Sequence, residues 1–206
     1  ALLTMQAASM SIAVSGMAGS FAKRRAFAYG PSSQEAGGPM TLDSDIARLK
    51  TQEERLQFDS FDEADAWRLG QAMRGLAEER GLPLVIDIRV AGRQLFHTAL
   101  AGTTPDNGEW VRRKINVVMR FHRSSYLVGR ETARKGEPLD EKRGVLPVDH
   151  APHGGCFPIR IRNTGVVGTI TVSGIPQRQD HGFVVECLCR HLGVAHEELA
   201  LPEQES

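Results

Sequence analysis

The sequence lacks an excess of either charge. Its 25 Lys and Arg residues balance 25 Asp and Glu residues, which gives a formal net charge of zero over 206 residues. Because the two charge types are interspersed along the chain, no global field attracts a nucleic acid or a membrane surface. The sequence also lacks the run of about 20 apolar residues that a transmembrane helix needs. We therefore expect a soluble protein that has neither a nucleic acid nor a membrane as partner.

Cysteine is scarce as well. The chain has three cysteines, an odd number, and Cys187 and Cys189 lie in a helical pattern. Side chains two residues apart on a helix face different directions, so these cysteines do not form a disulfide framework. A reducing, cytoplasmic setting is the expectation. The hydrophobic fraction of 41% suffices for one ordinary core, which predicts a single globular domain.

Several well-known catalytic motifs are missing. The sequence contains no G-x-S-x-G elbow, no Walker loop and no dinucleotide-binding fingerprint. Neither Cys156 nor Ser173 has a base that the sequence makes evident. These absences argue against nucleophilic hydrolysis.

The first 40 residues differ in composition from the rest. They are rich in Ala, Ser, Gly and Met, and a basic cluster at 23–25 follows the small apolar residues instead of preceding them, which is the wrong order for a secretory signal. An organelle transit peptide and a simple tail both remain open. We expect a flexible extension over residues 1–40, one globular domain over 41–201 and a short tail over 202–206.

Hydrophobic periodicity and turn signals predict an α/β protein with the element order ααββααββα. The expected helices span about 42–57, 60–81, 109–121, 124–136 and 179–192, and the expected strands span 84–90, 93–100, 157–162 and 166–173. Residues 103–108 are expected to be a loop, since they contain Pro, Asp, Asn and Gly. The pattern therefore predicts two hairpins separated by helices.

One loop is rich in groups that bind or position ligands. In VDHAPHGGCFPI, residues 148–159, His150 and His153 stand beside residues that fix or free the backbone. The pair Gly154-Gly155 either lets a ligand approach peptide N–H groups or serves a tight entry into the following strand. Both interpretations stay open on the sequence alone.

Other charged groups could complete a site with this loop. Asp180 and His181 open the last helix, and with the loop histidines they could hold a divalent metal, although loop histidines at this spacing are a weak metal signal. Asp180 also fits a helix cap. Arg112, Arg113 and Lys114 are consecutive on a helix, so only one or two of them can face a pocket, and a solvated face is the alternative.

Seven motifs, taken in order and spacing, resemble a known family. They are LVIDIR, AGTTPDN, W-x-x-RK, SSY-x-VG, HGG-x-FPIRI, GVVGTITVSG and QDH. This set resembles the haem-degrading-domain superfamily, which includes GlcG-like and HbpS-like proteins, and especially its little-characterised bacterial and fungal branch. The resemblance covers residues 42–199. It implies a profilin-like fold, in which helices flank an antiparallel sheet, and assembly into homo-oligomers.

The resemblance also implies a pocket and a ligand class. Some members bind haem or another tetrapyrrole, so haem is one candidate cofactor and a divalent metal is a weaker one. The positions that match the recurrent pocket are His153, Gly154, Gly155, Phe157, Pro158, Ser173, Gly174, Asp180 and His181, together with Trp110, Arg113 and Lys114 of W-x-x-RK.

Two functions follow as hypotheses. In the first, the protein is an oligomeric binding module whose pocket holds haem, a tetrapyrrole or another small anionic molecule. In the second, it is a lyase, isomerase or hydrolase of a carboxylated or carbonyl compound. Lys114 or Arg113 would bind the anion there, while His153 or His181, oriented by Asp180, would move a proton or bind a metal. The sequence does not decide whether the protein is an enzyme.

Overall fold

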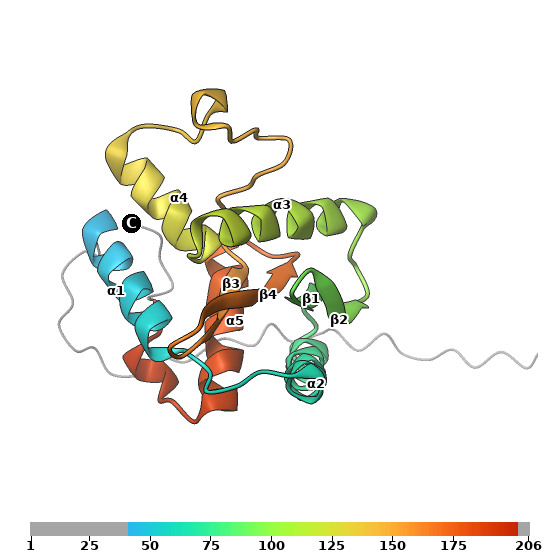
Figure 1. Cartoon of the computed structure of the whole chain (residues 1–206). Coiled ribbons are helices and arrows are strands. Elements are labelled where there is room, and N and C mark those ends of the chain that lie inside the picture. The colour runs from blue at the N-terminus through green and yellow to red at the C-terminus, as the bar shows by residue number, and fades with distance from the viewer. Residues whose placement is uncertain (1–40, 202–206) are drawn as a thin grey trace, which may run out of the picture. The chain divides into compact units, whose positions relative to one another are not determined.

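The structure is a computed structural model that describes residues 41–201 (Figure 1). The expected extension over 1–40 and the tail over 202–206 lie outside these residues, as does the choice between a transit peptide and a tail. No helix among the described residues is both long and apolar enough to cross a membrane.

The observed elements confirm the predicted order ααββααββα and the antiparallel sheet. In chain order they are α1 (Leu42–Arg55), α2 (Glu63–Glu79), β1 (Val85–Val90), β2 (Arg93–Ala99), α3 (Pro105–Phe121), α4 (Ser125–Lys135), η1 (Glu141–Arg143), β3 (Cys156–Ile161), β4 (Gly165–Ser173), α5 (Gln177–Leu192) and η2 (His196–Glu198), where η marks a 3-10 helix. The four strands lie in the order β2-β1-β4-β3, and every neighbouring pair is antiparallel.

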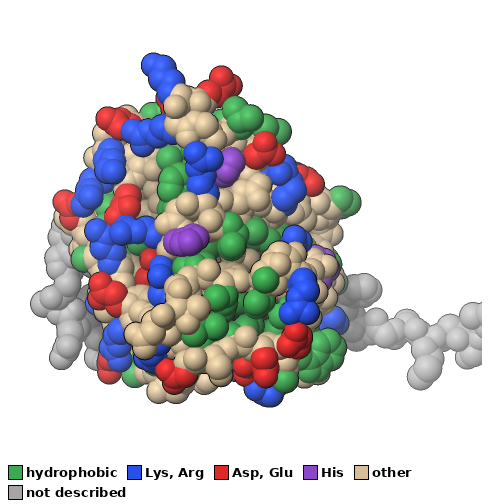
Figure 2. All heavy atoms as spheres, in the orientation of Figure 1, with side chains coloured by type: hydrophobic (Ala, Val, Ile, Leu, Met, Phe, Trp, Pro, Cys, Tyr) green, Lys and Arg blue, Asp and Glu red, His purple; other side chains and the backbone are tan. Residues whose placement is uncertain are grey.

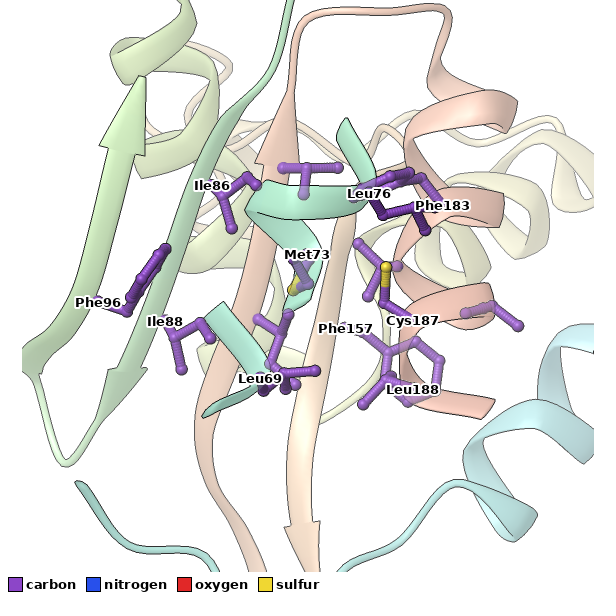
Figure 3. Close-up of a cluster of buried hydrophobic side chains, with 14 of the residues drawn as sticks. Leu69, Met73, Leu76, Ile86, Ile88, Phe96, Phe157, Phe183, Cys187 and Leu188 are labelled. Atoms are coloured by element: carbon purple, nitrogen blue, oxygen red, sulfur yellow. The ribbon is translucent and has the colours of Figure 1, made fainter. Parts of the chain in front are cut away.

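Helices α2 and α5 cover one face of the sheet and enclose the main core (Figure 3). Alternate residues of β1, Ile86 and Ile88, point into this core, as the period of a strand requires. Gly70 of α2 permits close packing, because a Cβ atom there would lie 2.3 Å from the ring of Phe96. The core therefore fixes the sheet against two helices.

Helix α3 lies across the other face (Figure 1). Val111, Ile115 and Val118 of this helix pack against Val85 and Cys156 of the sheet. The face is otherwise polar, since the strands also place buried threonines and a buried aspartate on it. Polar groups beneath α3 therefore lie on strands whose opposite face is packed in the main core.

The start of α3 differs from the prediction. The helix begins at Pro105 within the stretch expected to be a loop. Proline suits the first turn of a helix because its missing N–H would have no partner there, and the side chain of Asn107 accepts a hydrogen bond from the backbone N of Thr104 at 2.7 Å. The turn-forming residues of this stretch therefore begin a helix, which extends α3 toward the end of β4.

A buried polar cluster joins α1 to α4 and α5. Asp45 of α1 is fully buried and receives two hydrogen bonds from Arg178 of α5, at 2.7 and 3.0 Å, and one from Arg130 of α4 at 3.2 Å. Arg178 also donates to the hydroxyl of Tyr126 at 3.3 Å. We call these four residues the α1 cluster. It holds a helix that contributes little to the main core.

The surface mixes both charge types, as the sequence predicts, and carries some exposed apolar side chains. Figure 2 shows Lys and Arg interspersed with Asp and Glu, and hydrophobic side chains gathered on the face below α3. The large apolar residues that are most exposed are Trp67, Met119, Leu146 and Val148.

Candidate functional site

A cavity of about 400 Å³ opens where the first turns of α3 and α5 meet the end of β4. The residues that line it are Asp106, Asn107, Trp110, Lys114, His153, Ser173, Gly174, Ile175, Gln177 and Asp180. Six of these were predicted from the sequence: Trp110, Lys114, His153, Ser173, Gly174 and Asp180. The chain thus brings together residues from three distant segments.

An ion pair lies at the base of the cavity. Nζ of Lys114 is 2.7 Å from Oδ2 of Asp180 and also donates to the carbonyl of Val172 at 3.1 Å. Each of the two charged side chains is only 3% exposed. Oδ1 of Asp180 accepts from the backbone N of Ile175 at 3.3 Å, so the carboxylate also fixes the turn before α5.

Burial changes the protonation of this pair. Desolvation raises the pKa of Asp180 to about 6, and the opposing effects of Lys114 and of the backbone donors are smaller. A carboxyl group with a pKa near neutrality can gain or lose a proton at physiological pH. The pair is therefore both a structural link between α3 and α5 and a group that can change charge.

The double glycine lets the loop pack against this pair. Gly155 has a φ of +117°, and a Cβ atom there would lie 2.8 Å from Nζ of Lys114 and 3.0 Å from Cβ of Asp180. At Gly154 a Cβ atom would lie 1.9 Å from the carbonyl oxygen of Gln177. In this structure, then, the glycines admit close approach of the protein's own chain.

Aromatic rings form the mouth of the cavity. The rings of Trp110 and His153 meet edge to face, with centroids 5.2 Å apart, and the guanidinium of Arg113 lies 4.1 Å from the Trp110 centroid. Nε1 of Trp110 donates to Asp106 at 3.0 Å, which fixes the indole. A flat ligand can contact these rings.

His153 is solvent-exposed, but its pKa is lower than that of an ordinary histidine. Partial desolvation lowers its pKa, and the charges of Lys114 and Arg113 lower it further. The ring is therefore neutral at pH 7 and carries a lone pair. Neither ring nitrogen forms a hydrogen bond with residues 41–201, so this lone pair is available to a ligand.

The three consecutive basic residues of α3, Arg112 to Lys114, contact different partners. Arg112 binds Glu109 and Asp149, and Lys114 is held by Asp180. Arg113 has no carboxylate partner within the described part of the chain and lies over Trp110. The cation available to an anionic ligand is therefore Arg113, although Lys114 was an equal candidate in the sequence.

The structure places some predicted site residues away from the cavity. His181 is fully buried between Tyr126 and Phe157, and its Nε2 is 2.8 Å from Oε1 of Gln52. Burial lowers its pKa to about 3. Phe157 belongs to the main core, and Pro158 is a buried residue of β3. These three residues do not line the cavity.

The expected contact between Asp180 and a histidine is also not seen among residues 41–201. The carboxylate of Asp180 instead binds Lys114 of α3, whose ammonium group lies 2.7 Å away. Within the described part of the chain, therefore, no acidic side chain bonds to the ring of His153 or His181.

Four lining residues were not predicted: Asp106, Asn107, Ile175 and Gln177. The available signal was Thr104-Pro105, which is typical of a helix start and would have placed Asp106 and Asn107 in the first turn of α3. A protein-only metal centre does not fit, since residues 41–201 hold no group of three His, Cys, Asp or Glu side chains placed to share an ion.

Comparison with known proteins gives consistent family matches. The family model described as "Haem degrading protein HbpS-like" matches residues 61–189. A UPF0303 protein of Acidobacterium capsulatum is 54% identical over 164 residues, which cover 80% of this chain and 99% of the relative. A UPF0303 protein of Azotobacter vinelandii is 51% identical over 162 residues, which cover 79% and 98%.

Solved structures share the fold. The Ybr137w protein is 30% identical, with a TM-score of 0.65 over 72% of this chain and 87% of that protein. A complex described as PduOC:heme has a TM-score of 0.55 at 17% identity, over 66% and 98% of the two chains. HbpS has a TM-score of 0.51 at 18% identity, over 66% and 93%.

Proposed function

Because the chain belongs to the family of HbpS-like haem-degrading proteins, we propose that it binds a small anionic molecule with a flat ring system. The observation that carries this proposal is the convergence, in one cavity, of aromatic rings at the mouth and a buried ion pair at the base. Aromatic rings supply contact area, and a few placed polar groups supply orientation.

The polarity of the cavity decides how such a ligand would lie. Trp110 and Ile175 are the only large apolar residues in its lining, so the ring system belongs at the mouth and polar atoms belong inside. An acyl or hydroxyl oxygen can reach Ser173 and the Lys114–Asp180 pair. A carboxylate on the outer side meets Arg113.

Haem is the first ligand to test, and His153 favours it. A neutral imidazole with a free lone pair is a haem-iron ligand, and Arg113 beside it can pair with a propionate. When bound, haem would supply iron chemistry at this ring. Its porphyrin would extend across the mouth, since the cavity interior is mostly polar. The fold similarity to a PduOC:heme complex supports this choice.

A haem titration followed by absorbance tests the proposal. We expect a Soret band in the wild-type protein and at least a tenfold weaker affinity in His153→Gln, about 1.4 kcal/mol, with an unchanged melting temperature. His150→Gln is the matched control, because His150 lies in the same loop but outside the lining. If both variants bind haem like the wild type, His153 is not the ligand. If the protein does not bind haem but binds smaller carboxylates with a ring, the cavity is still the binding site and the ligand is not haem.

A second candidate function, an enzyme of carbonyl compounds, is favoured by Asp180. Its pKa of about 6 allows proton transfer next to the Lys114 ammonium, which can stabilise an enolate. Exchange of the α-hydrogens of small oxo acids in D₂O, followed by NMR, tests this function. Exchange that persists in Asp180→Asn would contradict the assigned role.

We also infer that the protein forms a homo-oligomer. Exposed apolar side chains favour this inference, because burial against a second copy would remove them from water; the largest are Trp67, Met119, Leu146 and Val148. Sedimentation at micromolar concentration should give a mass well above 22.6 kDa. A monomer under these conditions would remove the inference.

A further inference from the structure

A second polar cluster surrounds Asp87, and it shares no residue with the cavity. Asp87 lies in the middle of β1, where it pairs with His97 of β2 and Thr171 of β4. Its side chain is 0% exposed. Burial of a carboxylate in a strand lowers the stability of the fold by several kcal/mol unless hydrogen-bond partners compensate it. The partners of Asp87 therefore indicate why it is buried.

All partners of Asp87 are side chains that reach the surface. Nε of Arg89 donates to Oδ1 at 2.8 Å, and Nδ1 of His97 is 3.0 Å from Oδ2. The amide of Gln94 also donates to Oδ2. Arg89 and His97 remain 36% and 45% exposed. The buried carboxylate thus fixes three solvent-facing groups from below.

This arrangement decides where the proton of His97 lies. A carboxylate only accepts hydrogen bonds, so Nδ1 of His97 is the donor and the lone pair of the neutral ring is on Nε2. Nε2 makes no hydrogen bond to any residue in the described range, and the side chain is open to solvent. The guanidinium of Arg89 lies beside it because both groups bind the same carboxylate.

We propose that Asp87, Arg89 and His97 form a phosphoryl-accepting site. The donor class is a small compound with phosphorus on a good leaving group, such as a phosphoramidate or an acyl phosphate. Nε2 of His97 attacks phosphorus with its lone pair and forms the N–P bond. With phosphoramidate, the original P–N bond breaks and ammonia leaves with the bonding electron pair.

The two neighbours match the charges that form in this step. Attack turns the neutral ring of His97 into a cation, which the carboxylate of Asp87 stabilises through the Nδ1–H bond. Arg89 offers its outward N–H groups to the phosphoryl oxygens. Asp87 is a positioning residue, while His97 forms the new bond and Arg89 contacts the transferred group.

His150 supplies an internal comparison. Its Nδ1 is 3.2 Å from the carbonyl oxygen of Leu146, so it has the same tautomer without a carboxylate or a paired guanidinium. We would incubate the full chain with phosphoramidate near neutral pH and measure the rate of phosphohistidine formation at each histidine by mass spectrometry. His97 should react at least about tenfold faster than His150, the scale on which a supporting carboxylate acts.

Two variants sharpen the result. Asp87→Asn should bring the rate at His97 close to that at His150, and Arg89→Met should lower it by about tenfold. The rate at His150 in the same molecule should stay constant, which a general loosening of the fold would not allow. Equal rates at the two histidines in the wild-type protein would overturn the proposal without any variant. Binding in the cavity should be unaffected in every case.

Discussion

Two buried acid–base pairs occupy different regions of this molecule. Asp45 in the α1 cluster accepts hydrogen bonds from both terminal nitrogens of Arg178 and a further one from Arg130. Asp180 receives a single ammonium, that of Lys114, and lies against the cavity. The first carboxylate has a full set of strong donors, whereas the second remains difficult to ionise and has a pKa of about 6.

The difference shows that burial of charge alone does not identify a functional group. A bidentate Arg–carboxylate contact satisfies both oxygens and fixes geometry, which suits a joint between helices. A single ammonium leaves the carboxyl sensitive to a nearby ligand or proton. Completeness of pairing, together with access to a cavity, separates the structural pair from the candidate functional one.

The largest expected effect is on the α1 cluster. Asp45→Ala would leave Arg178 buried without its main partner, and we expect a loss of about 3–5 kcal/mol in the free energy of unfolding. Urea denaturation measures it. Asp43→Ala is the control, because Asp43 lies in the same helix turn but is 75% exposed, and should cost less than about 1 kcal/mol. Ligand affinity of the folded fraction should not change.

Removing one partner of the cavity pair should harm both stability and binding. Lys114→Met leaves Asp180 uncompensated and should cost about 3 kcal/mol in urea denaturation. The double variant with Asp180→Asn keeps an acceptor for the backbone N of Ile175 and should recover most of that loss. Ligand affinity should remain low in the double variant. Recovery of binding together with stability would make the pair purely structural.

The pH dependence of stability should separate the two buried groups of α5. The folded pKa of His181, about 3, lies below its ordinary 6.5, so its contribution to stability falls as pH drops below 6.5. Asp180 has the opposite sign, because its folded pKa of about 6 lies above 3.8 and its contribution falls as pH rises from 4 to 6.

A comparison of the wild type with His181→Gln isolates the first effect. Between pH 6.5 and pH 5 the stability advantage of the wild type should shrink by about 2 kcal/mol, which urea denaturation at both pH values would show. A constant difference would mean that the pKa of His181 is the same in the folded and the unfolded chain.

The smallest effect concerns the mouth of the cavity. Arg113→Gln should weaken an anionic ligand about tenfold and leave its uncharged ester unaffected, because only a charge-assisted contact is lost. Calorimetric titration with the acid and the ester measures both. Arg112→Gln is the control, since Arg112 binds Glu109 and Asp149 and has no role in the site. Equal weakening of acid and ester would point to lost stacking on Trp110.

The order of elements could be predicted from the sequence because period and turn signals agree along most of the chain. The start of α3 could not, since Pro105 and Asn107 are typical of a turn and of a first helical turn alike. The sequence alone does not distinguish the two. Because the helix begins at Pro105, Asp106 and Asn107 lie in its first turn and line the cavity.

The two predicted histidines show why the candidate site could be predicted only in part from the sequence. His153 and His181 were equal candidates in the sequence, but one lies at the mouth and the other in the interior. Adjacent helix residues point about 100° apart, so Asp180 can face the cavity while His181 faces α1. The partner that receives His181 is Gln52, 129 residues earlier, and no local pattern reveals such a contact.

The α1 cluster has a consequence for synthesis of the chain. Asp45 and Gln52 meet partners 133 and 147 residues later, Arg178 and Leu199. Until α5 has been synthesised, Asp45 has Arg130 of α4 as a partner but lacks the two stronger hydrogen bonds from Arg178. Long loop closures of this kind slow folding, so α1 should reach its final packing only after α5 and η2 emerge. A chain that stops before η2 would leave Gln52 without its acceptor on Leu199, and proteases should cut that end of the domain more easily.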